Sequence, residues 1–142
     1  MKELINRNDL SLRRGMMQDL HTNKKIILQK IKIYDRSKNV NSFTVNGSEA
    51  WIDRDTRSSL AYSTKCKLDS GQDTTALWLN GFRIEINCEV LLGLLNQLEV
   101  YALNCYDVTE QHKANVMNLE TIEDVINYDY TANYPDKLNV TL

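Results

Sequence analysis

The sequence predicts an α+β fold in which a strand–turn–strand–helix unit occurs twice. Apolar residues alternate with other residues around an Asn-Gly pair in two segments, 43–52 and 77–86. Asn-Gly favours the tight turn of a β-hairpin because both residues readily adopt positive φ. The two pairs are 34 residues apart, since 47 plus 34 is 81. After each hairpin a polar residue, Asp53 or Asn87, stands where it can cap a helix.

These patterns predict internal repeats of the ββα unit at about 40–70 and 74–106. A lone hairpin is only marginally stable in water, so we expect the hairpins to combine into one small antiparallel sheet packed against helices. A solenoid needs about three or more stacked units. A chain of 142 residues is also the usual size of one domain. We therefore predict a single domain over residues 18–142.

The amino-terminal part is predicted to differ from this domain. Residues 1–17 show no sustained periodicity, which indicates an arm. From Asp19 or Thr22 to Tyr34, apolar residues fall close to one helical face and predict an amphipathic helix. Its remaining faces are rich in lysine. We interpret them as solvated, with phosphate binding as the alternative.

The helix of the second repeat carries the strongest periodic signal in the chain. Apolar residues recur there at three- and four-residue steps: Leu91, Leu94, Leu95, Leu98, Ala102 and Cys105. The helix of the first repeat, from Asp53 to about Lys67, has only a narrow apolar stripe. Thr109 and Thr121 are predicted to cap two further helices, and residues 138–142 alternate like an edge strand.

The overall charge argues against two classes of partner. Seventeen basic and nineteen acidic residues give a formal charge of -2, so no positive field attracts nucleic acid or an anionic membrane. The first residues contain no long apolar run, which predicts neither a secretory signal nor a membrane span. Three cysteines without CxxC spacing, Cys66, Cys88 and Cys105, indicate reduced, buried thiols in the cytoplasm.

No motif of a known catalytic mechanism is present. The sequence contains no glycine-rich phosphate loop, HExxH, GxSxG or Cys/His cluster, so we predict no enzyme activity, cofactor or metal. His21 and His112 lie far apart in the sequence and lack metal-ligand spacing. A Cys105–His112 dyad is the catalytic alternative. We interpret this pair instead as a buried cysteine and a surface histidine.

Aromatic residues are the candidates for binding. Tryptophan and tyrosine supply large contact areas with a polar group and are enriched in protein interfaces. The residues selected are Trp51, Trp78, Arg83, Tyr106, Tyr130 and Tyr134. In the alternative interpretation, both tryptophans and Tyr101 fill the core and the last tyrosines fasten the carboxy-terminal segment.

Several stretches resemble one known family. They are residues 34–47, the Leu-Trp-Leu-Asn-Gly hairpin at 77–81, and the segments 98–102, 108–113 and 128–138. Together they resemble domain-of-unknown-function family 4376, and the resemblance covers about residues 24–142. It implies a setting in tailed phages and prophages, including those of gut Bacteroides, commonly near tail-fibre and tail-assembly genes. It implies no catalytic residues.

Two functional hypotheses follow. The first is a non-enzymatic phage interaction protein, either a tail or tail-fibre assembly factor or a small virion component. Its partner would be a phage tail or fibre protein, or copies of itself in a homo-oligomer, in the host bacterial cytoplasm or the virion. The alternative is an anti-defence protein that binds a host protein, or that sequesters a small nucleotide signal between groups such as Trp78, Arg83, Lys24 and Arg57.

Overall fold

The α+β class is confirmed by the computed structural model, which describes residues 7–142. Its helices are α1 (Arg7–Asp35), α2 (Arg54–Asp69), α3 (Cys88–Asn118) and α4 (Ile122–Ile126). Its strands are β1 (Phe43–Val45), β2 (Ser48–Ala50), β3 (Thr74–Leu79), β4 (Phe82–Asn87) and β5 (Asn139–Val140). The order β1–β2–α2 followed by β3–β4–α3 is the predicted order of both units.

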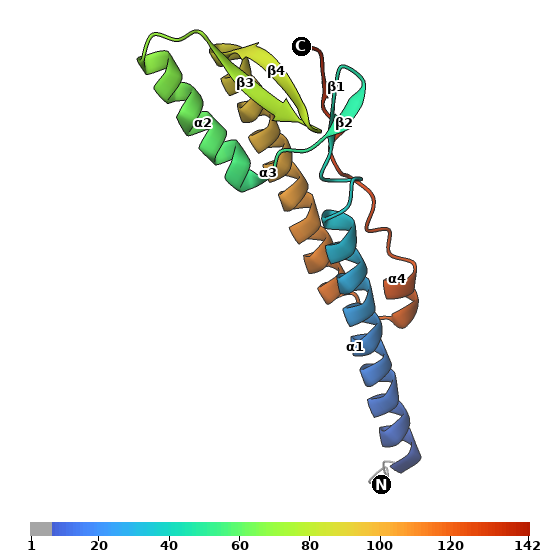
Figure 1. Ribbon diagram of the computed structural model, residues 1–142. Coiled ribbons are helices and arrows are strands. Elements are labelled where there is room, and N and C mark those ends of the chain that lie inside the picture. Colours follow the sequence, from blue (N-terminus) through green and yellow to red (C-terminus); the bar gives the residue numbers. More distant parts are fainter. Residues whose placement is uncertain (1–6) are drawn as a thin grey trace.

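Helix α3 is the long axis of the molecule. It packs against α2 and the hairpins near its beginning, and against α1 near its end (Figure 1). The Asn87 side chain caps it by accepting hydrogen bonds from the backbone N–H groups of Glu89 and Val90. The predicted helix start at Thr109 is wrong, because α3 continues through it. Thr109 is buried inside the helix, and its hydroxyl donates to Asp35 Oδ1 at 2.8 Å.

Both predicted hairpin turns are confirmed. Asn46 and Gly47 have φ of 50° and 84°, and Asn80 and Gly81 have φ of 52° and 80°. Two consecutive residues with positive φ match the twist of the flanking strands, which is the reason for the Asn-Gly preference. The β3–β4 ladder is the longer one, with six residue pairs from Thr74↔Asn87 to Leu79↔Phe82.

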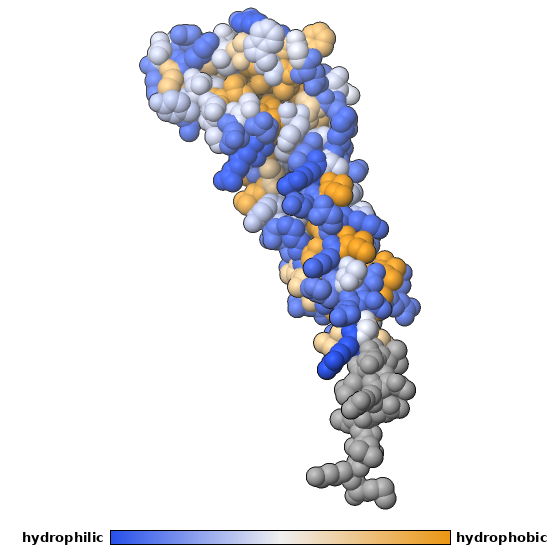
Figure 2. Space-filling view, turned by 60° about the horizontal axis from the view of Figure 1, so that its bottom comes forward, coloured by the Kyte–Doolittle hydropathy of each residue, from blue (hydrophilic) through white to orange (hydrophobic). Residues whose placement is uncertain are grey.

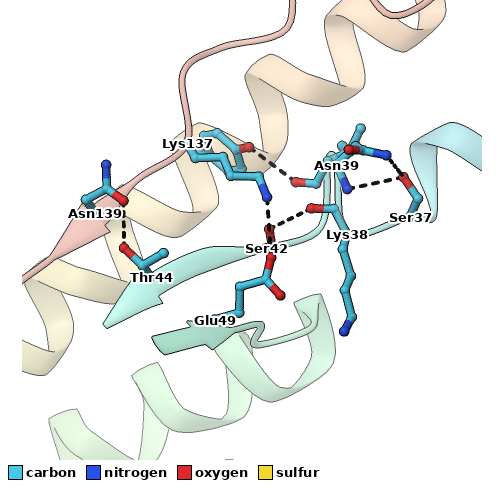
Figure 3. Close-up of polar contacts among 10 residues, drawn as sticks. Ser37, Lys38, Asn39, Ser42, Thr44, Glu49, Lys137 and Asn139 are labelled. Atoms are coloured by element: carbon cyan, nitrogen blue, oxygen red, sulfur yellow. Dashed lines mark hydrogen bonds and ion pairs between the residues drawn. The ribbon is translucent and has the colours of Figure 1, made fainter. Parts of the chain in front are cut away.

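The prediction that both hairpins combine into one antiparallel sheet is wrong. Strands β2, β1 and β5 form a mixed sheet in that order, with β5 parallel to β1, and β3–β4 is a separate hairpin. The carboxy-terminal segment occupies the free edge of β1, where the backbone N–H groups of Thr44 and Asn46 donate to carbonyl oxygens of Leu138 and Val140. Figure 3 shows Thr44 also joined to Asn139 by a 2.6 Å side-chain hydrogen bond. The final strand is thus confirmed at Asn139–Val140.

The amino-terminal part of the chain is helical where it is described. Helix α1 includes residues 7–17, which the sequence predicts to be an arm. The helix therefore begins before its predicted start at Asp19 or Thr22. A helix extends at low cost from a turn that is already formed, so the packed later part of α1 supports continuation without an apolar stripe. Residues 1–6 of the predicted arm lie outside the described residues. The domain boundary at residue 17 stays a prediction.

The main core lies between α3 and the hairpins. The predicted α3 residues Leu91, Leu94, Leu95 and Leu98 are each at most 4% exposed. They pack with buried residues from all four hairpin strands, including Phe43 and Leu77. A smaller cluster, centred on Ile27, Ile31, Val116 and Val125, joins α1, α3 and α4. No helix among residues 7–142 combines the length and apolar character needed to cross a bilayer.

Candidate functional site

The predicted binding residues lie in three separate places. Trp51 and Tyr106 line one hollow beside α2 and α3. Trp78 and Arg83 are paired across the β3–β4 hairpin. Tyr130 and Tyr134 both pack on Tyr34, with ring centroids 5.9 and 5.5 Å apart. The structure therefore offers three candidate surfaces rather than one binding site.

The first place contains two adjoining hollows. A groove of about 450 Å³ runs between the amino-terminal turn of α2 and the middle of α3. Its lining residues are Arg54, Arg57, Glu99, Ala102, Leu103 and Tyr106, and we call it the Arg57 groove. A second hollow of about 270 Å³ shares Arg54, Arg57, Ala102 and Tyr106 with it and extends to Trp51 and Asp35. The two hollows form one continuous candidate surface.

Arg57 is the central side chain of this groove. It is 5% exposed, and its Nη1 donates to the Ile52 carbonyl oxygen at 2.7 Å. Its Nε donates to Glu99 Oε2 at 3.0 Å. The guanidinium carbon lies 5.5 Å from the ring centroid of Trp51, within cation–π distance. A buried charge needs such partners, so Arg57 is held in one position at the base of the groove.

Aromatic packing fixes Trp51 from its other side. Its ring meets Tyr101 edge-on at a centroid distance of 6.4 Å. Tyr101 is buried, and its hydroxyl donates to the Val40 carbonyl oxygen at 3.3 Å. Burial raises the pKa of Tyr101 because the phenolate would be poorly solvated there. Trp51 is half-buried between Tyr101 and Arg57, so it is a wall of the hollow and only partly a core residue.

Apolar contact surface dominates the α3 side of the groove. Leu103 and Tyr106 are each 61% exposed, although the predicted core stripe of α3 is buried. Residues at spacings of three and four share a helix face, so Glu99, Leu103 and Tyr106 form one exposed strip along α3. Such exposed aromatic and aliphatic groups around an anchored arginine are the composition found at the centres of protein interfaces.

The charges around the groove are mixed. Asp53 caps α2, and the backbone N–H of Thr56 that donates to it lowers the pKa of this carboxyl. Asp53 and Asp35 line the second hollow and Glu99 lines the first, beside Arg54 and Arg57. Three acidic groups beside two basic ones make a poor site for a phosphate-bearing ligand.

The four side chains suggested to bind a small nucleotide signal, Trp78, Arg83, Lys24 and Arg57, do not lie together in the structure. Lys24 donates through Nζ to the Met117 carbonyl oxygen at 2.7 Å, between α1 and α3. Trp78 is 64% exposed and shares the outward face of the hairpin with Arg83. Arg57 is engaged at the α2–α3 groove. Because Lys24, Arg57 and the Trp78–Arg83 pair lie in three different parts of the fold, the four side chains do not converge on one ligand.

The prediction of a surface histidine is wrong. His112 is 3% exposed; its Nδ1 lies 2.6 Å from Tyr128 Oη and its Nε2 lies 2.7 Å from the Ala132 carbonyl oxygen. The carbonyl only accepts, so Nε2 carries a proton and donates to it. The His112 ring also packs against Tyr134, whose hydroxyl bonds Thr109 Oγ1 at 2.7 Å. These contacts attach the carboxy-terminal segment to α3.

Cys105 and His112 do not form a nucleophile–base pair. Both ring nitrogens of His112 are already engaged by other groups. Burial raises the pKa of the Cys105 thiol, which reduces the thiolate needed for nucleophilic attack. Cys88 and Cys105 are buried as predicted, whereas Cys66 is exposed and contradicts that prediction. Cys66 lies in α2, whose apolar stripe is too narrow to cover it.

Sequence reasoning missed the central role of Arg57. When the two predicted repeats are aligned with their 34-residue offset, Arg57 of the first corresponds to Leu91 of the second, since 57 plus 34 is 91. Both are buried, so one position in the two units holds an arginine in α2 and a core leucine in α3. The sequence alone shows that an arginine stands in the first repeat where the second has a leucine. Leu103 was also missed, although an apolar residue outside the core stripe of an amphipathic helix indicates exposed apolar surface.

The chain has no similarity that identifies its function. A scan against protein-family models finds no match, and searches of curated proteins and of solved structures find none either. Within residues 7–142, no group of three or more His, Cys, Asp or Glu side chains is placed to hold a metal ion. The geometry of the described residues is therefore the basis for a functional proposal.

Proposed function

We propose that this chain is a non-enzymatic interaction protein of a tailed phage, acting in tail or tail-fibre assembly or as a small virion component. The phage setting comes from the resemblance to domain-of-unknown-function family 4376. Under this proposal, the two ββα units are a duplication in which α2 has become the shorter, more polar copy. The Arg57 groove lies between this copy and α3.

One observation carries the interaction role. Leu103 and Tyr106 are both 61% exposed on a strip of α3 that borders a buried, fully positioned arginine. Energetic hot spots in interfaces are enriched in tyrosine and arginine and lie near pockets that exclude water. We infer that a protein segment with apolar side chains covers Leu103 and Tyr106. Glu99, half-exposed beside Arg57, supplies a polar rim.

Affinity purification tests this role. Tagged protein would be recovered from phage-infected cells and its partners identified by mass spectrometry, together with the proteins of purified virions. We expect tail or fibre proteins to be recovered with the wild type and lost with Tyr106→Ala. Tyr62→Ala is the matched control, because Tyr62 is 73% exposed on α2 and lies outside the groove lining. Recovery of the same partners with both variants would reject the groove as the interface.

The anti-defence alternative gives a different result in the same experiment. Recovery of a host protein alone, with the chain absent from virions, would favour it over assembly. Its nucleotide-binding form requires a basic, converging pocket, whereas the Arg57 groove contains Glu99 and adjoins Asp35 and Asp53. A host protein is therefore the form of this alternative that the geometry favours.

A further inference from the structure

The projecting end of α1, residues 7–17, extends beyond α4 and beyond the end of α3 (Figure 1). This end continues a 29-residue helix whose later part packs against α3 and α4, so the extension itself costs little. This segment also contains Gly15, which lowers helix propensity by about 1 kcal/mol relative to alanine. From Arg13 onward, where side chains are described, Arg13, Arg14, Met16 and Met17 are exposed on this end and are accessible to a partner.

Exposed methionines lie where this segment meets the rest of the protein. Met16 is 56% exposed and Met17 is 71% exposed. Together with Leu20 they border a shallow, mainly apolar hollow of about 270 Å³ whose other wall includes Ile122 at the start of α4. Figure 2 shows apolar patches on a mostly hydrophilic surface, including the region next to the grey amino-terminal segment. Methionine adapts readily to a partner surface.

Opposite charges flank these methionines. Arg13 and Arg14 are exposed on the projecting end of α1. On the other side of the methionines, Glu120 lines the hollow, and Glu123 is exposed in the first turn of α4. One surface thus carries a basic end, an apolar middle and an acidic end. Such a surface is complementary to a second copy of itself turned by a two-fold rotation.

We propose that two copies of this chain form a dimer in which the projecting ends of α1 cross antiparallel at Met16 and Met17. A two-fold axis between positions 16 and 17 places residue 13 of one copy beside residue 20 of the other, since 13 plus 20 equals 16 plus 17. Leu20 lines the same hollow as Glu120 within each copy. Arg13 and Arg14 of one copy therefore meet the acidic start of α4 in the other.

Sedimentation velocity of the purified full chain over a range of concentrations tests this dimer without reference to the phage assignment. We expect the wild type to dimerise, and Met17→Glu to weaken the dimer by roughly tenfold or more because it buries an unpaired charge. Ile33→Glu is the matched control, since Ile33 is 61% exposed on α1 but lies away from the hollow. A wild type that stays monomeric at all concentrations, or equal weakening by both substitutions, would overturn the proposal.

Charge reversal tests the antiparallel arrangement itself. Arg13→Glu/Arg14→Glu and Glu120→Lys/Glu123→Lys should each dimerise less than the wild type, and a mixture of the two variants should form a heterodimer. In that heterodimer both sets of reversed charges face opposite charges. Far-UV circular dichroism confirms that each variant keeps its helices. Failure of the mixture to recover association while each variant stays folded would overturn the arrangement.

Discussion

Replacing Arg57 by alanine should lower the free energy of unfolding by about 2–4 kcal/mol, which is large for a polar residue. The substitution leaves the buried Ile52 carbonyl without the guanidinium that donates to it at 2.7 Å. A hydrogen bond from a charged donor contributes about 1.5–3 kcal/mol. The Trp51 contact adds about 0.5–2 kcal/mol. The Glu99 pair adds only about 0–1 kcal/mol, because the Glu99 side chain is 53% exposed. These contributions share one side chain and are not additive.

Urea unfolding followed by tryptophan fluorescence measures this loss, with circular dichroism as a second probe of two-state behaviour. Arg54→Ala is the matched control, since Arg54 is an exposed arginine of the same groove and should change stability by less than about 0.5 kcal/mol. If Arg57→Ala were no more destabilising than Arg54→Ala, the reasoning that Arg57 is a positioned, buried charge would be refuted.

Arg57→Leu then separates stability from binding. Leucine is the residue at the corresponding position of α3, where Leu91 is fully buried. The leucine side chain fills part of the volume of the arginine stem but leaves the Ile52 carbonyl unpaired. Arg57→Leu should therefore lower the unfolding free energy less than Arg57→Ala does. A folded Arg57→Leu protein that no longer captures the wild-type partner would show that the guanidinium serves recognition as well as packing.

Three further predictions concern other parts of the fold. His112→Phe should lower the unfolding free energy by about 1–3 kcal/mol in thermal or urea denaturation, because it leaves the Ala132 carbonyl unpaired; a wild-type midpoint would contradict this. A maleimide should label Cys66 in the native protein and reach Cys88 and Cys105 only after unfolding, as counted by mass spectrometry; native labelling of Cys105 would contradict its burial. Burial raises the pKa of Tyr101 in the folded protein above its ordinary value of 10.0. The contribution of neutral Tyr101 to stability is therefore complete below pH 10.0 and is lost as the pH rises through the pKa of the folded protein. Tyr101→Phe should therefore make the unfolding free energy fall less steeply with pH in alkaline solution. A fall as steep as that of the wild type would contradict the raised pKa of Tyr101.

Local structure was predictable wherever neighbouring residues decide it. The Asn-Gly turns require only the positive φ of two adjacent residues, and the leucine stripe of α3 requires only helical spacing. Thr121 caps α4 by accepting from the backbone N–H of Asp124, as its position indicated. Thr109 has similar capping chemistry, but a tertiary contact with Asp35 keeps it inside α3. The Thr109 hydroxyl is engaged by Asp35 and Tyr134, whereas the Thr121 hydroxyl is available to cap α4.

Strand pairing was not predictable because the deciding contacts are distant in sequence. Two hairpins of similar pattern favour one antiparallel sheet, yet β1 pairs with β5 from the end of the chain. The two hairpins are joined instead by a side chain, since Asn80 Nδ2 donates to the Glu49 carbonyl oxygen at 2.7 Å. A two-residue strand such as β5 has too little sequence pattern to reveal its partner.

The candidate site shows why residue type alone separated the aromatic residues poorly. Tyr130 and Tyr134 have the composition expected of an interface, but they pack on Tyr34 and fasten the carboxy-terminal segment. Tyr106 has the same chemistry and is exposed, because it lies outside the buried stripe that includes Tyr101 and Cys105. The difference arises from position on α3 relative to that stripe. Helical phase combined with the Arg57–Leu91 comparison therefore separates binding candidates from structural residues better than aromatic content does.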